Sequence, residues 1–265
     1  MLVEARNISL DVPDMSHRVL IGQRRRLRIL RNVSISLKKG ETLGLVGESG
    51  SGKTSLGRCL LRLYEPSEGT LLFDGTDITH AEAAGLKPLR RRMQMIFQDP
   101  QSSLNPRRTI GGILATALTL NGMDASERAI AAILDRVGLP SSAIGRYPHQ
   151  LSGGQRQRVG IARAVALRPD FVVADEIVSG LDVSTQAQVL DLLKGLRDEM
   201  GLALAFISHD LSVVRHLCER VVIMRAGEIV EEGLTADVFK NPKTEFTRTL
   251  IDSIPLPEVR SGWLG

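Results

Sequence analysis

The chain has 265 residues, of which 43% are hydrophobic, 24% charged and 3% aromatic, and its formal net charge is +4 at pH 7. This composition is typical of a folded globular protein with one or two domains, and so few aromatic residues argue against a surface that stacks many nucleic-acid bases. Its two cysteines, Cys59 and Cys218, are too few for a disulfide framework or a cysteine-based metal site, which fits a reducing compartment.

Strand patterns alternate with helix patterns along most of the chain. The predicted strands cover residues 2–12, 32–37, 43–46, 70–73, 93–97, 171–174, 202–207, 220–225 and 228–230. The predicted helices cover residues 54–63, 86–92, 110–120, 125–137, 155–167, 183–200 and 210–217, and two short helices follow. This alternation predicts an α/β protein with a mainly parallel sheet. Residues from about 100 to 168 show no strand signal, so we expect a helical insert there.

The ends of the chain and one basic stretch give weaker signals. Five arginines gather between the first two predicted strands: Arg24, Arg25, Arg26, Arg28 and Arg31. We expect a solvated loop there, with contact to anionic lipid or nucleic acid as the alternative. The start of the chain lacks a signal-peptide pattern, no run is long and apolar enough to span a membrane, and we expect the last ten residues to be loosely held.

A glycine-rich stretch lies between the predicted strand at 43–46 and the helix at 54–63. It reads Gly47, Glu48, Ser49, Gly50, Ser51, Gly52, Lys53 and Thr54. Its glycines let the backbone wrap closely, so that N–H groups and the positive end of the helix face phosphate oxygens. Lys53 would place a charge on the β- and γ-phosphates, and the Thr54 hydroxyl can bind Mg²⁺. The stretch therefore predicts a nucleotide phosphate site.

Two carboxylates, Asp175 and Glu176, follow the apolar strand predicted at 171–174. An aspartate at the end of a buried strand is a common ligand of Mg²⁺ beside a phosphate loop. Glu176, one residue further, can accept a hydrogen bond from a water molecule in line with the γ-phosphate. The pair favours hydrolysis over phosphoryl transfer to a hydroxyl substrate.

A second helix start is suited to anions. Leu151 is followed by Ser152, Gly153, Gly154 and Gln155, and the predicted helix begins there. The serine hydroxyl, the bare glycine amides and the helix dipole all favour a phosphate. One nucleotide can use both helix starts if two subunits pack head to tail.

These motifs occur in a fixed order together with Gln98 after an apolar strand, SGLD at 179–182 and His209 in the stretch FISHD. Over nearly the whole chain they resemble the nucleotide-binding subunit of ABC transporters. The resemblance implies a P-loop NTPase ABC ATPase fold, with a RecA-like core of mainly parallel sheet and an N-terminal antiparallel β-subdomain. In this reading residues 1–250 are one ATPase domain. Its parts are the core with the β-subdomain (1–98 and 169–240), a helical subdomain (about 99–168) and a C-terminal tail (241–265).

The resemblance also implies a role for each motif. ATP would lie between the phosphate loop of one subunit and the LSGGQ stretch of the other, so Ser152 and Gly154 would serve the partner's ATP. Glu176 would be the catalytic carboxylate. Lys53 and Thr54 would bind phosphate and Mg²⁺, and Asp175 would bind Mg²⁺ through water. Gln98 would contact the Mg²⁺–water region and link the site to the membrane partner. His209 would contact the γ-phosphate, and Asp182 would communicate across the dimer.

Two segments, residues 90–110 and 241–255, carry a narrower resemblance to the ATPase subunits of peptide, nickel and opine importers. It implies a second, different ATPase subunit and hence a heterodimer, two transmembrane permease subunits and an extracytoplasmic solute-binding protein. It places the chain on the cytoplasmic face of the inner membrane, held there by its partners, with no nucleic acid bound. The cargo stays open among peptide, nickel and opine. The alternative is a soluble ABC ATPase without a transport role, similar to the carbon–phosphorus lyase accessory type.

The sequence departs from the family pattern in three ways. No aromatic residue precedes Tyr64, so we expect His17 or an arginine among 24–28 to stack on adenine, or base selectivity to be poor. Ile177 stands where the family usually has proline, which leaves the backbone after Glu176 less constrained. No cysteine follows Cys218, so the iron–sulfur cluster of some relatives is not expected.

Overall fold

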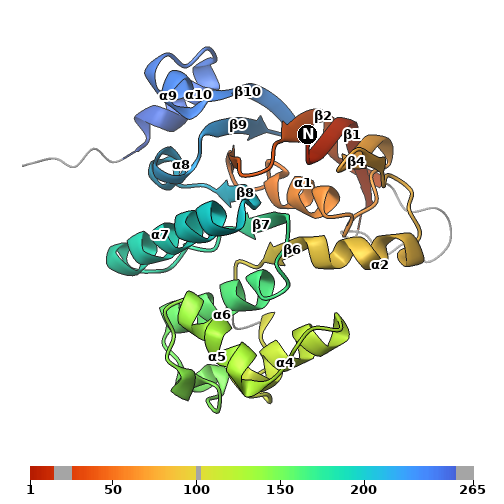
Figure 1. Cartoon of the computed structure of the whole chain (residues 1–265). Helices are drawn as coiled ribbons and strands as arrows, with labels where there is room; N and C mark the ends of the chain where they lie inside the picture. Colours follow the sequence, from red (N-terminus) through yellow and green to blue (C-terminus); the bar gives the residue numbers. More distant parts are fainter. Residues whose placement is uncertain (15–25, 100–102, 255–265) are drawn as a thin grey trace, which may run out of the picture.

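The computed structural model describes residues 1–14, 26–99 and 103–254, and they form two sheets with helices around them (Figure 1). The first sheet is antiparallel, with four strands in the order β2-β1-β4-β5. Its strands are β1 (Val3–Pro13), β2 (Arg26–Leu37), β4 (Glu68–Phe73) and β5 (Thr76–Asp77). This sheet corresponds to the β-subdomain that the resemblance implied.

The second sheet has six strands in the order β10-β9-β3-β8-β7-β6. Every neighbouring pair from β9 to β6 is parallel, and β10 at the edge pairs antiparallel with β9. The strands are β3 (Thr42–Val46), β6 (Met93–Ile96), β7 (Phe171–Asp175), β8 (Ala203–Ser208), β9 (Arg220–Arg225) and β10 (Glu228–Leu234). Apolar runs such as FVVA in β7 become strands buried on both faces, because helices or the other sheet cover each side.

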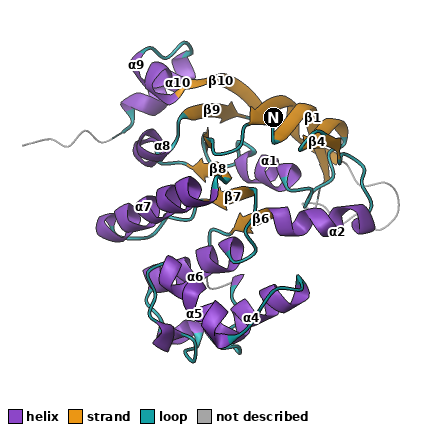
Figure 2. Ribbon diagram, viewed as in Figure 1, coloured by secondary structure: helices purple, strands orange, loops and turns teal. Residues whose placement is uncertain are grey.

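The helices divide between the two faces and one end of this sheet (Figure 2). The α-helices are α1 (Lys53–Leu60), α2 (Ala83–Arg92), α4 (Ile110–Leu120), α5 (Glu127–Arg136), α6 (Gly153–Val165), α7 (Val183–Met200), α8 (Leu211–Leu217), α9 (Thr235–Lys240) and α10 (Glu245–Asp252). Between β6 and β7 the described residues contain helices and no strand, as the sequence predicted. Among all described residues, no helix has the length and apolar character to cross a bilayer.

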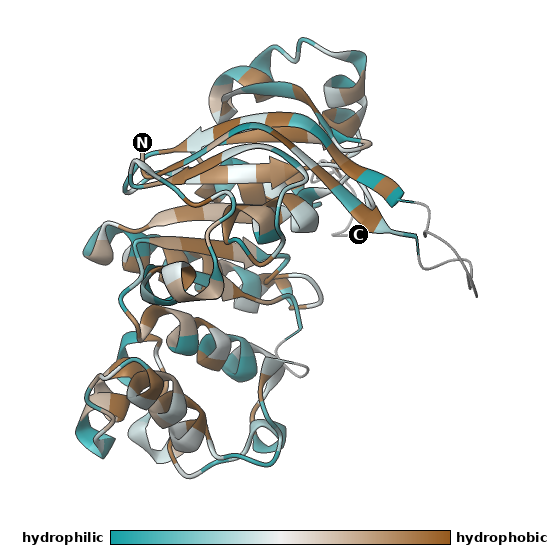
Figure 3. Ribbon diagram, turned by 90° about the vertical axis from the view of Figure 1, so that its right-hand side faces the viewer, coloured by the Kyte–Doolittle hydropathy of each residue, from teal (hydrophilic) through white to brown (hydrophobic). Residues whose placement is uncertain are grey.

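Two apolar clusters hold these layers together. One joins the antiparallel sheet, α1 and one face of the six-stranded sheet, where Val173 of β7 is buried. The other joins the opposite face, where Val172 is buried, to α4, α5, α6, α7 and α8. Residues 172 and 173 point to opposite faces because side chains alternate along a strand. Figure 3 shows hydrophobic residues along much of the strands, with hydrophilic residues among them and in the loops.

The prediction of a solvated arginine loop is wrong for the described part of that stretch. Arg26, Arg28 and Arg31 lie in β2. Arg28 donates to both carboxylate oxygens of Asp11, at 2.9 and 3.1 Å, and to Glu68 at 2.7 Å. These carboxylates lie on β1 and β4, so the charges pair across the sheet and allow a basic sequence to form a strand. His17, Arg24, Arg25 and the last ten residues lie outside the described residues.

Candidate functional site

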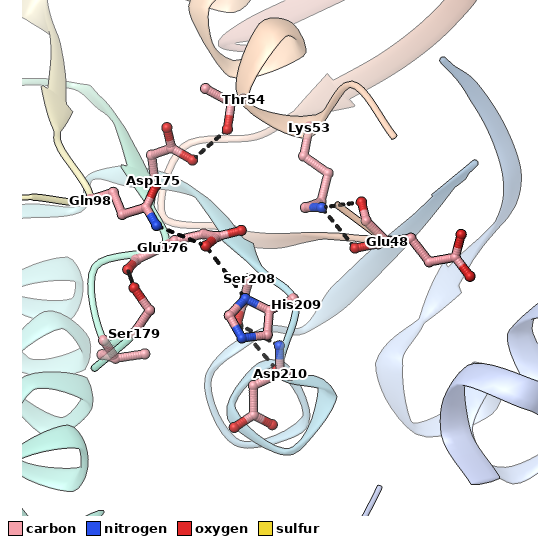
Figure 4. Close-up of polar contacts among 12 residues, drawn as sticks. Glu48, Lys53, Thr54, Gln98, Asp175, Glu176, Ser179, Ser208, His209 and Asp210 are labelled. Atoms are coloured by element: carbon pink, nitrogen blue, oxygen red, sulfur yellow. Dashed lines mark hydrogen bonds and ion pairs between the residues drawn. The ribbon is translucent and has the colours of Figure 1, made fainter. Parts of the chain in front are cut away.

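The predicted site residues meet at one edge of the six-stranded sheet. Carboxyl ends of parallel strands share an edge, and ligands of α/β sheets bind there. The phosphate loop follows β3, Gln98 follows β6, and Glu176 and His209 follow β7 and β8. The register aligns these ends, with Val46 opposite Ser208, Asp175 opposite Ile207, and Ile96 opposite Ala174. Figure 4 shows the resulting group of side chains.

The phosphate loop holds the ammonium group of Lys53 in a defined place. The Nζ atom donates to the carbonyl oxygens of Gly47 at 2.7 Å and Glu48 at 2.8 Å (Figure 4). Lys53 is only 5% exposed, and burial lowers its pKa, while the carboxylates of Glu176 and Asp175 oppose that shift. A Cβ atom on Gly47 would lie 2.1 Å from the carbonyl oxygen of Met224. Glycine is therefore required where this loop packs against β9.

Thr54 and Asp175 form a pair of oxygen groups beside the loop. The Thr54 hydroxyl donates to Oδ1 of Asp175 at 2.9 Å. Asp175 is 4% exposed, and burial raises its pKa even though the bond from Thr54 acts in the opposite direction. A hydroxyl and a buried carboxylate side by side are the hard oxygen donors that Mg²⁺ prefers.

The Glu176 carboxylate contacts the side chains of both Gln98 and His209. Its Oε2 atom accepts a hydrogen bond from Nε2 of Gln98 at 3.2 Å and lies 3.4 Å from Nδ1 of His209. The backbone of Glu176 is in the left-handed region, with φ 47°. The structure thus brings together Glu176, Gln98 and His209, the three residues that the resemblance assigned to catalysis, from the ends of three different strands.

A cavity of about 400 Å³ lies between the phosphate loop and the side chains of Gln98 and Glu176. It is lined by Ile29, Ser49, Gly50, Gly52, Lys53, Thr54, Ser55, Gln98 and Glu176. Ile29 was not predicted as a site residue, because it falls within the stretch that was expected to be a basic loop. Only the pairing of β2 with β1 indicates that Ile29 lies at this cavity. Of the arginines considered for adenine stacking, Arg26 and Arg28 both bond to Asp11. A larger cavity, of about 840 Å³, lies among α8, α9 and α10 and contains none of the predicted site residues.

The LSGGQ stretch starts α6, and none of its residues lines the nucleotide cavity. The Ser152 hydroxyl accepts from the Gln155 amide at 3.3 Å, and Oε1 of Gln155 accepts from the Ser152 amide at 3.0 Å. A Cβ atom on Gly154 would lie 2.6 Å from Cγ2 of Thr185, so this stretch packs closely against α7 of its own chain. The structure brings neither Ser152 nor Gly154 to the phosphate loop of the same chain.

Asp182 caps the start of α7. Its carboxylate accepts from the amide of Thr185 at 2.9 Å and from the hydroxyl of Thr185 at 2.7 Å. These bonds, with another from Ser184, hold the pKa of Asp182 below its usual range. The next residue, Val183, is 83% exposed, so an apolar side chain lies on the surface beside Asp182. The role assigned to Asp182 across a dimer stays a prediction.

The raised pKa of Asp175 predicts a measurable effect on stability. The folded chain favours the neutral carboxyl, so the ionised form costs stability at pH 7, and this cost disappears as pH falls through the raised pKa to the ordinary value of 3.8. Asp175→Asn keeps an acceptor for Thr54 and carries no charge, so we expect it to raise Tm at pH 7. The gain should vanish at pH 3.5. Thermal unfolding without nucleotide measures it.

The matched control is Asp74→Asn, because the bond from Arg92 lowers the pKa of Asp74. That carboxylate contributes stability when ionised, so its loss should lower Tm at pH 7. A Tm for Asp175→Asn that falls at pH 7 as it does for Asp74→Asn would contradict the assigned cost of the buried charge.

Comparisons with known proteins show the family and the fold of the chain. A family model described as ABC transporter matches residues 30–179. A Brucella ovis protein named for peptide import and ATP binding is 52% identical over 236 residues, which cover 88% of this chain and 74% of that protein. The oligopeptide transport ATP-binding protein AppF of Bacillus subtilis is 48% identical over 239 residues, covering 88% and 72%. The dimeric ATP-binding cassette MJ0796, bound to ADP and Pi, superimposes with a TM-score of 0.77 and 28% identity, over 88% of this chain and 98% of that one.

Proposed function

The chain belongs to the ABC transporter family of ATPases, and from this premise we propose that it is the nucleotide-binding subunit of a peptide importer. It binds ATP and hydrolyses it. The observation that supports this function best is the position of the Glu176 carboxylate, between Gln98 and His209, at a cavity that also contains Lys53 and Thr54. Peptide is the cargo that we propose, because relatives at 52% and 48% identity are named for peptide or oligopeptide import.

In the proposed site, the phosphate loop binds the triphosphate through its backbone amides and the Lys53 ammonium group. Ser51 is buried within this loop, and Glu48 and Ser49 complete it. Thr54 and Asp175 would hold Mg²⁺, with Gln98 beside them, and the bound ion would neutralise charge on the phosphates. Their two adjacent oxygens fit an ion that keeps waters and phosphate oxygens as most of its ligands. Among the described residues, no group of three or more acidic, histidine or cysteine side chains gathers to hold a metal without nucleotide.

Hydrolysis needs a water oriented toward the γ-phosphate. We assign this task to Glu176, which accepts a hydrogen bond from the water and takes its proton as the water attacks. Gln98 and His209 hold Oε2 of the carboxylate at 3.2 and 3.4 Å, which fixes its direction before the reaction. The side chain of His209 is 61% exposed, and we also assign it a contact with the γ-phosphate.

A second subunit is part of the proposal because the LSGGQ stretch lies outside the chain's own nucleotide cavity. We assign Ser152, Gly153, Gly154 and Gln155 to the ATP held by a partner, and the partner's equivalent residues to the ATP held here. The dimeric state of the similar cassette MJ0796 supports this arrangement. The importer resemblance favours a different ATPase subunit as partner, hence a heterodimer.

A groove on the helical insert (the subdomain proposed at about 99–168) is the proposed contact with a permease subunit. It has a volume of about 300 Å³, and its lining includes apolar side chains of α4, α5 and their connection, such as Leu118, Met123 and Ile133. Arg91, Arg136 and Arg168 line the same groove. A partly apolar cytoplasmic segment with an acidic or polar rim fits such a surface. Packed helices then carry movement between the groove and the ATP site.

The complete assembly that we propose has two ATPase subunits, two transmembrane permease subunits and an extracytoplasmic solute-binding protein. This chain would lie at the cytoplasmic face of the inner membrane through those partners. The alternative of a soluble, non-transport ABC ATPase such as the carbon–phosphorus lyase accessory type gains no support from the relatives found.

Affinity purification of the tagged chain from detergent-solubilised membranes tests the assembly. We expect permease subunits and a second, different ATPase in the eluate. Ile133→Asp in the groove should reduce permease recovery at least about tenfold, because a charge replaces an apolar contact. Leu120→Asp, on a side chain that is 79% exposed and outside the groove, is the control. A complex without any membrane protein, from wild-type chain, would contradict the importer.

A further inference from the structure

The turn after Glu176 closes on the carbonyl oxygen of Glu176 itself. The Ser179 hydroxyl donates to that oxygen at 2.8 Å, and the Ser179 amide donates to the same oxygen at 3.1 Å. On the other side, the amide of Glu176 donates to the carbonyl oxygen of Ile207 in β8 at 3.0 Å. Both backbone polar groups of Glu176 are therefore held, one by a neighbouring strand and one by Ser179.

This double attachment coincides with an uncommon backbone conformation. Glu176 has φ 47°, in the left-handed region that residues with a Cβ atom adopt only when their surroundings impose it. Changing φ to a negative value would redirect the Cα–Cβ bond. The carboxylate would then leave its place between Gln98 and His209, where Oε2 lies 3.2 and 3.4 Å from them.

Other residues of the turn anchor it to the core and to α7. Ile177 and Val178 are 1% and 3% exposed, and both belong to the apolar core on that face of the sheet. The carbonyl oxygen of Val178 accepts from Nε2 of Gln186 at 3.0 Å. Ile177 has no ring to fix its own φ, and the carbonyl oxygen of Glu176 accepts from both the hydroxyl and the amide of Ser179.

We propose that Ser179 is a positioning residue for hydrolysis, which holds the Glu176 backbone in the left-handed conformation and so aims the catalytic carboxylate. Ser179 does not touch the nucleotide cavity, and it acts only through Glu176. This inference rests on the proposed role of Glu176 as the residue that orients water.

Ser179→Ala removes the hydroxyl bond and leaves the Lys53 and Thr54 contacts unchanged. We expect kcat for ATP hydrolysis to fall about 10- to 100-fold, the cost of a small misplacement of a catalytic group. The Kd and KM for ATP should stay within about twofold, because phosphate binding depends on the other loop. Ser179→Thr keeps a hydroxyl at this half-buried position and should restore kcat to within about threefold of wild type.

The matched control is Ser253→Ala in the C-terminal region. Its hydroxyl also donates to the carbonyl oxygen three residues earlier, that of Leu250 at 2.6 Å, far along the chain from the site. Both variants should show the same small change in Tm, and only Ser179→Ala should lose kcat. Amide hydrogen exchange should accelerate at residues 176–181 in Ser179→Ala while the β7 core stays protected.

Three results would overturn the inference. The first is a wild-type kcat for Ser179→Ala. The second is a loss of kcat that Ser179→Thr does not restore. The third is a loss of kcat in Ser179→Ala that comes with an equal loss of ATP affinity and a Tm well below that of Ser253→Ala. Activity of Glu176→Gln is measured in parallel. A wild-type rate there would overturn the proposed function, whereas an inactive Glu176→Gln beside a fully active Ser179→Ala would overturn only this inference.

Discussion

Glu176→Gln is expected to lower the rate of ATP hydrolysis by at least about 1,000-fold while ATP still binds. Glutamine has the same shape, and its side-chain oxygen can still accept the bond from Gln98, seen here at 3.2 Å to Oε2. It carries no negative charge and cannot take a proton from the attacking water. Hydrolysis of labelled ATP, measured with the second subunit present, gives the rate.

The same variant should accumulate in the ATP-bound, paired state, because the step that would open the pair no longer occurs. Size-exclusion chromatography with ATP and Mg²⁺ should show a stable pair for Glu176→Gln and a transient one for wild type. Glu82→Gln, an exposed carboxylate at the start of α2, is the control and should behave as wild type. Turnover by Glu176→Gln at the wild-type rate would show that another group activates the water.

Local patterns were sufficient to predict the family, the α/β class and most of the strands. Apolar runs such as residues 171–174 became strands buried on both faces. The resemblance grouped Gln98, Asp175 and His209 in advance, and the fold places them together because parallel strands end at a common edge. Helix and strand limits differ by a few residues, as where α6 begins at Gly153 rather than Gln155.

What the sequence could not predict depends on residues far apart in the chain. Arg28 belongs to a strand because Asp11 and Glu68 lie beside it, 17 and 40 residues away. Ile29 reaches the nucleotide cavity for the same reason. The left-handed backbone of Glu176 depends on bonds to Ile207 and Ser179, and no residue type at 176 signals it.

The use of LSGGQ by a partner's ATP was predicted from two phosphate-binding helix starts in one chain, and it stays a prediction. In the fold of a single chain, the LSGGQ stretch lies away from the chain's own phosphate loop. Gly154 packs against Thr185 of its own α7, while the nucleotide cavity is lined by β2, the phosphate loop, Gln98 and Glu176. Within one chain the two elements therefore lie apart, which agrees with the proposal that a second subunit completes the site.

Lys53→Met is expected to weaken ATP binding by about 100-fold, which corresponds to about 2.7 kcal/mol. Methionine preserves the apolar stem but removes the ammonium group, which is held by carbonyl oxygens of the loop at 2.7 and 2.8 Å. Because Lys53 is 5% exposed, its attraction to a phosphate would be little screened by water. The stabilisation of the folded chain by ATP measures the affinity, since Tm rises with the ratio of ligand concentration to Kd.

The comparison of Lys53→Met with Glu176→Gln separates binding from chemistry at this site. ATP at a concentration that raises the Tm of wild type should raise that of Glu176→Gln equally and leave that of Lys53→Met nearly unchanged. Without ATP, Lys53→Met should not be strongly destabilised, because burial already lowers the pKa of this lysine and its charge costs desolvation. Lys194→Met, an exposed lysine on α7, is the control for loss of one positive charge. An ATP-induced rise in Tm for Lys53→Met equal to that of wild type would mean that the backbone amides of residues 47–54 bind the phosphates without this side chain.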